Sequence, residues 1–230
     1  SLGVGRGDTV ALMLTNRPEF SLADTAVMHL GATAFSVYNT SSAEQAQHVF
    51  RNAGNRVVVT ERQFLSRVLE SRTPEIEHIV LVDGADNGTI SLQDLARLRV
   101  PGFDFDRAWR AVQPDDVVTL IYTSGTTGPS KAVQLTHGSV LFQTRGVAAI
   151  LGLQADGRSI SYLPSAHVGD RCLTHYGASL CFGNSVTSIP DHRQVGLALV
   201  EVRPTVFGGV PRVWEKLKAG LEAAGITDPA

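Results

Sequence analysis

The sequence has few of the features that mark secreted, membrane-spanning or nucleic-acid-binding proteins. It contains two cysteines in 230 residues, and its formal net charge is −2. No apolar run approaches the roughly 18 residues that a membrane-spanning helix needs. The near-neutral charge gives no general attraction to nucleic acid or to an anionic membrane. We therefore expect neither a nucleic-acid partner nor a transmembrane segment.

The two cysteines, Cys172 and Cys181, are nine residues apart in a segment with the apolar spacing of one helix. Positions so far apart along a helix are too distant for a disulfide bond. We predict two buried thiols in a reducing compartment, and hence a cytoplasmic location. The spacing of His167, Asp170 and His175 is too weak a pattern for a metal site, so no metal ligands are predicted.

Short apolar runs alternate with helical patterns along most of the chain. Runs rich in β-branched residues have the composition of buried strands, and short turns join them to the helices. The predicted strands cover residues 10–14, 34–38, 56–60, 78–82, 116–122, 159–163, 185–189 and 205–207. Helix signals include Pro18 in a first turn, an S-x-x-E capping box at residues 41–44 and a C-cap at Gly54. This alternation predicts an α/β fold with doubly wound, mostly parallel sheets and helices packed on them.

Residues 101–116 interrupt the alternation with two prolines, a glycine, two phenylalanines and four aspartates. We predict a polar connector that lies on the surface. It divides the chain into a first α/β subdomain at residues 1–100 and a second at residues 117–230.

Residues 122–131 read Tyr-Thr-Ser-Gly-Thr-Thr-Gly-Pro-Ser-Lys and contain almost nothing to bury. We expect them to join the strand at 116–122 to a helix at 139–151. Glycines let backbone N–H groups approach an anion, hydroxyls donate further hydrogen bonds, and an ammonium supplies the countercharge. A P-loop has glycine before the lysine, where this chain has Ser130. The pattern favours a different polyphosphate-binding loop over a flexible Ser/Thr/Gly connector. Its predicted ligands are Thr123, Ser124, Gly125, Thr126, Thr127, Gly128 and Lys131.

This stretch, with its continuation Ala-Val-Gln-Leu-Thr-His137, resembles the AMP-binding signature of the adenylate-forming superfamily. Within that superfamily it is most similar to the long-chain acyl-CoA synthetases. The usual pattern is T-S-G-T-T-G-x-P-K-G, so Ser130 replaces a proline and Ala132 replaces a glycine. Neither replacement removes a phosphate ligand.

Two later stretches resemble the same family. Residues 162–171, Tyr-Leu-Pro-Ser-Ala-His-Val-Gly-Asp-Arg, are similar to its L-P-x-A-H motif with an acidic residue and an arginine behind it. The resemblance implies that His167 lies near the carboxylate and phosphate of an acyl-adenylate; a histidine bonded only to backbone is the alternative. Asp170 and Arg171 form either a local ion pair or ligand contacts. Residues 203–216 resemble the long-chain subgroup.

The resemblance implies an acid–thiol ligase. Such an enzyme uses ATP and Mg²⁺ to convert a long-chain fatty acid to acyl-AMP, and then coenzyme A to form acyl-CoA, with Lys131 and His167 as the implied catalytic residues. It also implies a partial large domain of the acyl-CoA synthetase-like fold. The family's G-Y-G-x-T-E segment, its ribose-binding Asp and Arg, and its small C-terminal domain have no counterpart in this sequence. We therefore expect a piece of a longer enzyme that is inactive by itself.

Two other functions stay open. One is a non-catalytic interaction or regulatory module with a degenerate ATP loop, and the other is an adenylating enzyme for an aryl or amino acid. The run at residues 211–216 favours fatty acids, and its Trp214 is expected in a helix core. Nearby basic residues form either a solvated face or a peripheral membrane contact; they are Arg203, Arg212, Lys216 and Lys218. The oligomeric state also stays open.

Overall fold

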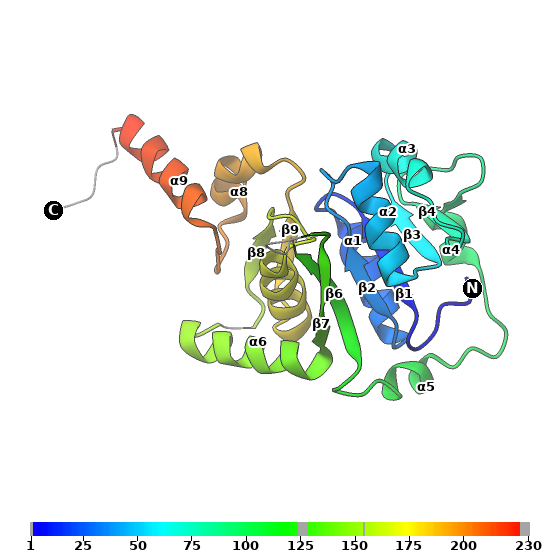
Figure 1. Cartoon of the computed structure of the whole chain (residues 1–230). Coiled ribbons are helices and arrows are strands. Elements are labelled where there is room, and N and C mark those ends of the chain that lie inside the picture. Colours follow the sequence, from blue (N-terminus) through cyan, green and yellow to red (C-terminus); the bar gives the residue numbers. More distant parts are fainter. Residues whose placement is uncertain (1, 124–127, 154, 226–230) are drawn as a thin grey trace.

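The computed structural model describes residues 2–123, 128–153 and 155–225. A central sheet of seven strands has the order β5-β4-β3-β1-β2-β6-β7 (Figure 1). The strands are β1 (Thr9–Met13), β2 (Thr33–Ser36), β3 (Val57–Thr60), β4 (His78–Leu81), β5 (Ile90–Ser91), β6 (Val117–Thr123) and β7 (Lys131–Thr136). All neighbouring strands are parallel except β6 and β7. The prediction of a mostly parallel α/β fold is confirmed.

Helices cover both faces of this sheet, and a second, two-stranded parallel sheet follows along the chain. The second sheet consists of β8 (Arg158–Ser161) and β9 (Ser185–Ser188). The helices are α1 (Pro18–His29), α2 (Ala43–Ala53), α3 (Arg62–Glu70), α4 (Leu92–Arg97), α5 (Phe105–Arg110), α6 (His137–Leu151), α7 (Val168–Asp170), the π-helix η1 (Arg171–Cys181), the 3₁₀-helix η2 (His192–Gln194), α8 (Val195–Val202) and α9 (Pro211–Ala223). No helix among the described residues is long and apolar enough to span a membrane.

Alternation along the central strands builds two apolar layers, because successive side chains of a strand point to opposite faces. Ala11 and Met13 of β1 pack on one face with Phe50 of α2, which is fully buried. Val10 and Leu12 pack on the other face against α1. The middle of the sheet is therefore covered on both sides, as a parallel sheet requires.

The caps of α2 show how closely local sequence sets the helix ends. Ser42, not Ser41, is the N-cap: its side chain accepts from the Gln45 N–H, while the Gln45 side chain accepts from the Ser42 N–H. The predicted capping box is therefore wrong by one residue. Gly54 ends the helix with φ of 63°, so the predicted C-cap is confirmed.

Three connections differ from the sequence prediction. Lys131 starts an edge strand, β7, so the loop after Thr123 joins two antiparallel strands and not a strand and a helix; α6 begins at residue 137, two residues before its predicted start. Residues 205–207 do not form a strand; the N–H groups of Thr205 and Val206 donate to the Arg158 carbonyl, and the Thr205 hydroxyl accepts from the Arg158 N–H. The predicted polar connector contains the short helix α5. β6 and β7 join the sheet that the first 100 residues begin, and the division into two subdomains stays a prediction.

The cysteines also differ from expectation. Both are free thiols on η1, and Cys172 is buried as predicted. Cys181, at the C-terminal end of the helix, is exposed. The prediction of two buried thiols is therefore wrong for Cys181.

Candidate functional site

Two cavities meet at the side chains of Tyr38 and His167, which line both. The first, of about 880 Å³, lies where β2 and β6 end, and Thr123 and Gly128 are part of its wall. The second, of about 450 Å³, is lined mainly by apolar side chains of β8, α6, η1 and residues 206–210. Ligands of open α/β sheets gather at the carboxyl ends of the strands, and the first cavity has this position.

Of the two glycines predicted as phosphate ligands at residues 123–131, only Gly128 lies within the described residues. Its φ is 102°, a backbone conformation that side-chain-bearing residues rarely adopt, although a Cβ there would meet no atom within 4 Å. Backbone geometry, not crowding, is therefore the reason for glycine at this position. Four other predicted ligands, Ser124, Gly125, Thr126 and Thr127, lie outside the described residues.

Lys131 lies directly opposite Thr123 in the antiparallel register of β6 and β7. Its side chain is exposed and lines a neighbouring cavity of about 900 Å³, together with Arg6 and Asp116. Within the described part of the chain Lys131 forms no ion pair. The structure thus places Thr123, Gly128 and His167 on one cavity and Lys131 on the next one, so its phosphate role stays a prediction.

His167 is held by the backbone around it. The backbone N–H of His167 donates to the Pro164 carbonyl at 2.8 Å. The imidazole Nδ1 accepts from the Gly169 N–H at 3.0 Å and so caps α7. In the neutral ring the hydrogen is therefore on Nε2. The side chain is exposed at the junction of the two cavities. Backbone bonding thus fixes the ring and leaves one N–H donor for a ligand.

Behind the cavities, Arg171 is completely buried. Its guanidinium donates to Asp24 of α1, to Ser36 Oγ at 2.7 Å, to the Ala34 carbonyl at 3.2 Å and to the Tyr176 hydroxyl at 3.0 Å. Of the two alternatives for Asp170 and Arg171, the local ion pair is wrong, because Arg171 turns towards the central sheet and pairs with Asp24. This cluster joins η1 to α1 and β2.

Charge balance inside this cluster favours an ionised Asp24. Burial alone opposes the carboxylate, but the Arg171 guanidinium and His175 outweigh it and hold the pKa of Asp24 below its ordinary value. His175 Nε2 lies 3.0 Å from Asp24 Oδ2. The sequence reasoning missed Asp24; an acidic residue in an otherwise apolar helical stretch was the available signal.

A second buried network joins the end of β1 to the turn that carries His167. Asn16 Nδ2 donates to Ser161 Oγ and to the Leu163 carbonyl, both at 2.8 Å. Ser161 Oγ donates in turn to Asp170 Oδ2 at 2.9 Å. Burial raises the pKa of Asp170 to about 6. These bonds hold the His167 turn against the central sheet, and none of them was predicted.

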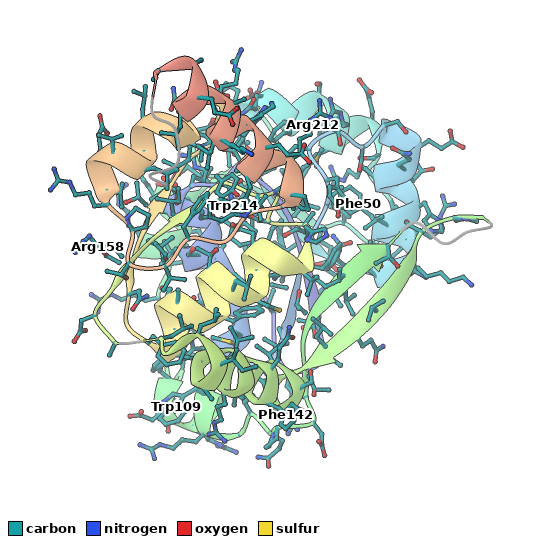
Figure 2. All side chains as sticks on the ribbon, turned by 90° about the vertical axis from the view of Figure 1, so that its left-hand side faces the viewer. Phe50, Trp109, Phe142, Arg158, Arg212 and Trp214 are labelled. Carbon is teal, nitrogen blue, oxygen red and sulfur yellow. The ribbon has the colours of Figure 1, made fainter. Side chains whose placement is uncertain are left out.

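Stacked aromatic rings form the outer wall of the apolar cavity. Tyr162 stacks on Phe207 with ring centroids 5.6 Å apart, and Phe207 meets Trp214 edge-on at 5.1 Å. The Tyr162 hydroxyl donates to the Gly208 carbonyl at 2.9 Å. Trp214 is 49% exposed and lies near the centre of the view in Figure 2, so the prediction that it is core is wrong. The four basic residues near it are all exposed.

Among the described residues, no three His, Cys, Asp or Glu side chains are grouped so as to hold a metal ion. The polar side chains that line the first cavity include the hydroxyls of Thr40, Ser41 and Thr123, the imidazoles of His48 and His167 and the carboxylate of Glu44.

Comparison with known proteins agrees with this geometry. Residues 1–228 match the model of the AMP-binding enzyme family. The chain belongs to this family. Among curated AMP-binding relatives, the fatty-acid–CoA ligase fadD11 of Mycobacterium tuberculosis is 53% identical over 136 residues, which are 59% of this chain and 24% of fadD11. The long-chain-fatty-acid–CoA ligase ACSBG2 of Xenopus laevis is 30% identical over 240 residues, 97% of this chain and 32% of ACSBG2.

A solved structure shows the same fold. The inhibitor-bound N-terminal domain of FACL13 from Mycobacterium tuberculosis superposes with a TM-score of 0.77 at 25% identity. The match covers 94% of this chain and 53% of that domain. The chain therefore spans about half of the solved FACL13 domain and a third or less of the two curated ligases.

Proposed function

We propose that the chain carries the phosphate-binding and acyl-binding part of a long-chain fatty-acid–CoA ligase. The observation that supports this most is the pair of cavities that meet at His167. A fatty acyl-adenylate has the same two parts, a polar nucleotide and an apolar chain, joined at one acyl phosphate. In this proposal the anhydride lies at His167, the phosphates at the loop 123–131 and the chain in the apolar cavity.

The chemistry proposed for the assembled enzyme is transfer of an adenylyl group followed by transfer of an acyl group. A carboxylate oxygen attacks the α-phosphorus of ATP; the new O–P bond replaces the bond to the β-phosphate, and pyrophosphate leaves. The sulfur of coenzyme A then bonds to the acyl carbon, and AMP leaves. Both reactants of the first step are anions, so the site must neutralise charge and hold the two groups in line.

The residues of this chain supply donors for that task. Thr123 and the backbone at Gly128 line the phosphate side, and the Nε2–H of His167 is free to donate to an acyl or phosphate oxygen. We assign Lys131 to the β- and γ-phosphates, where Mg²⁺ bound with ATP supplies further positive charge. Ser124, Gly125, Thr126 and Thr127 complete the loop in this proposal. We propose that the 230 residues alone bind these substrates but do not catalyse the reaction, because the relatives are so much longer.

Binding of a fatty acyl-adenylate mimic tests the assignment of the two cavities. We expect a non-hydrolysable hexadecanoyl-sulfamoyl adenosine to bind more tightly than its acetyl counterpart in calorimetric titration, because only the longer chain fills the apolar cavity. Leu173 lines that cavity and is 46% exposed. Leu173→Asp should therefore lower the affinity for the hexadecanoyl ligand by about tenfold or more without unfolding the chain.

Leu180 provides the matched control. It lies on the same helix with 42% exposure and is not part of the cavity wall. Leu180→Asp should therefore leave the affinity within about twofold of the parent chain. Equal affinities for the acetyl and hexadecanoyl ligands would contradict the fatty-acid assignment and favour an adenylating enzyme for another acid.

Removing the Lys131 ammonium tests the phosphate assignment separately. We expect Lys131→Ala to weaken Mg-ATP binding by about tenfold and AMP binding by much less, because the lysine is assigned to the β- and γ-phosphates. Lys218 on α9 is 77% exposed at its side chain and far along the chain from the loop, so Lys218→Ala is the control. A parallel loss of ATP and AMP affinity, or none, would show that Lys131 does not bind these phosphates.

A further inference from the structure

Helix α2 contacts the loop 123–131 directly before its lysine. The imidazole Nε2 of His48 lies 3.0 Å from the Ser130 carbonyl oxygen, and the two residues are 82 positions apart in the sequence. A carbonyl oxygen can only accept a hydrogen bond, so Nε2 carries the hydrogen and donates it. The protonated ring also has a hydrogen on Nε2. The contact is therefore compatible with both the neutral and the charged form of His48.

The same helix contacts the strand that leads into the loop. The Tyr122 hydroxyl, one residue before Thr123, donates to Asn52 Oδ1 at 2.9 Å. His48 and Asn52 are four positions apart, which places their side chains on one side of α2. Figure 2 shows α2 in light blue beside the hairpin of β6 and β7. Helix α2 thus holds the chain next to both ends of the loop.

His48 also lies at the boundary between two cavities. His48, Pro129 and Ser130 line both the first cavity of about 880 Å³ and the neighbouring cavity of about 900 Å³. Lys131 lines the neighbouring cavity and not the first one. Because Ser130 directly precedes Lys131, the position of Ser130 determines where the lysine side chain begins. The bond from His48 to Ser130 therefore fixes the base of the lysine at the edge of the first cavity.

We propose that His48 is a positioning residue for phosphate binding, which acts by holding Ser130 and thereby the Lys131 ammonium. His48 lies outside the loop itself and exerts its effect through the backbone. A donor that is already in place needs less ordering when its ligand binds, and affinity rises accordingly. This inference rests on the proposed assignment of the loop to the phosphates of ATP. It adds a residue of α2 to the part of the chain that determines phosphate affinity.

Two replacements of His48 test the proposal. Gln carries an N–H donor at the end of its side chain, whereas Leu has a similar size and no donor. We expect His48→Leu to weaken Mg-ATP binding by about fivefold and AMP binding by less than about twofold in calorimetric titration, because the loop is assigned to the β- and γ-phosphates. His48→Gln should keep the Mg-ATP affinity within about twofold of the parent chain. A merely structural role would change urea unfolding without separating ATP from AMP.

Two further measurements separate His48 from the lysine through which it acts. In the double variant His48→Leu/Lys131→Ala, the His48 replacement should add less than about twofold to the loss of Mg-ATP affinity caused by Lys131→Ala, because the position of the segment no longer matters once the ammonium is gone. Hydrogen exchange needs no ligand. The amides of residues 130–132 should exchange faster in His48→Leu than in the parent chain and in His48→Gln.

His29→Leu is the matched control. The His29 imidazole also donates to a backbone carbonyl, that of Thr25 at 2.7 Å, but this bond lies within α1 and His29 lines neither cavity. Its replacement should leave the Mg-ATP affinity and the exchange at residues 130–132 unchanged. Circular dichroism checks that each variant is folded.

Three results would overturn the proposal for His48. They are an unchanged Mg-ATP affinity of His48→Leu in a chain whose affinity depends on Lys131, losses that multiply in the double variant, and unchanged exchange at residues 130–132. A parent chain that does not bind Mg-ATP would instead refute the proposed function, and the exchange measurement would then still decide whether His48 fixes the segment.

Discussion

Replacement of Arg171 by alanine is expected to lower the free energy of unfolding by about 3–5 kcal/mol. Arg171 is fully buried, and its guanidinium is the main charge partner of the buried Asp24. Without it, Asp24 keeps a carboxylate that water cannot reach, and the acceptors Ser36 and Ala34 lose a donor. The measurement is urea unfolding at pH 7.

Arg193 gives the comparison for this experiment. It pairs with Asp191 at 2.8 Å, but its side chain is 81% exposed, so Arg193→Ala should change stability by less than about 1 kcal/mol. The apolar double replacement Asp24→Leu/Arg171→Met should recover much of what Arg171→Ala loses, because it removes both charges together. Equal effects of the Arg171 and Arg193 replacements would show that the buried cluster does not hold the fold.

Asp170 should make stability depend on pH in the opposite sense to most carboxylates. Burial raises its pKa from 3.8 to about 6, so the folded state binds the proton more tightly than the unfolded state. The resulting stabilisation is complete below pH 4 and is lost as the pH rises through 6. Because each tenfold difference in proton affinity between the two states corresponds to about 1.4 kcal/mol, the stabilisation amounts to about 3 kcal/mol.

Asn cannot ionise, so Asp170→Asn removes this dependence. We expect the difference in unfolding free energy, parent minus variant, to fall between pH 4 and pH 6.5 and to level off above pH 7. Asp191→Asn is the control, because Arg193 lowers the pKa of Asp191 to about 2 and its titration lies below this range. A parent-minus-Asp170→Asn difference that stays constant from pH 4 to pH 8 would contradict the buried, proton-binding carboxyl.

The features of the fold that depend on neighbouring residues in the sequence were predicted. The strands at residues 10–14 and 56–60, the Gly54 cap and the parallel order all follow from short-range apolar pattern and turn chemistry. Thr123 and Gly128 were predicted for the same reason, because composition alone marks a stretch with little to bury, and both line the first cavity. β7 was missed since an edge strand with an exposed face, starting at Lys131, has no clear alternation.

The contacts behind the cavities could not be predicted, because they join residues far apart in sequence. Asn16 meets Ser161 across 145 positions, and no short-range signal connects the two. The same holds for Arg171, whose neighbour Asp170 is the obvious partner in sequence although the fold directs the two side chains to different elements. Exposure of Trp214 and Cys181 likewise depends on what packs over them in three dimensions, which composition does not encode.

The distance in sequence between Asp24 and Arg171, 147 positions, has a kinetic consequence. We expect a contact that closes so long a stretch of chain to form late, after the nearer strands have paired. Its loss should therefore shorten the lifetime of the native state while leaving the rate of refolding nearly unchanged.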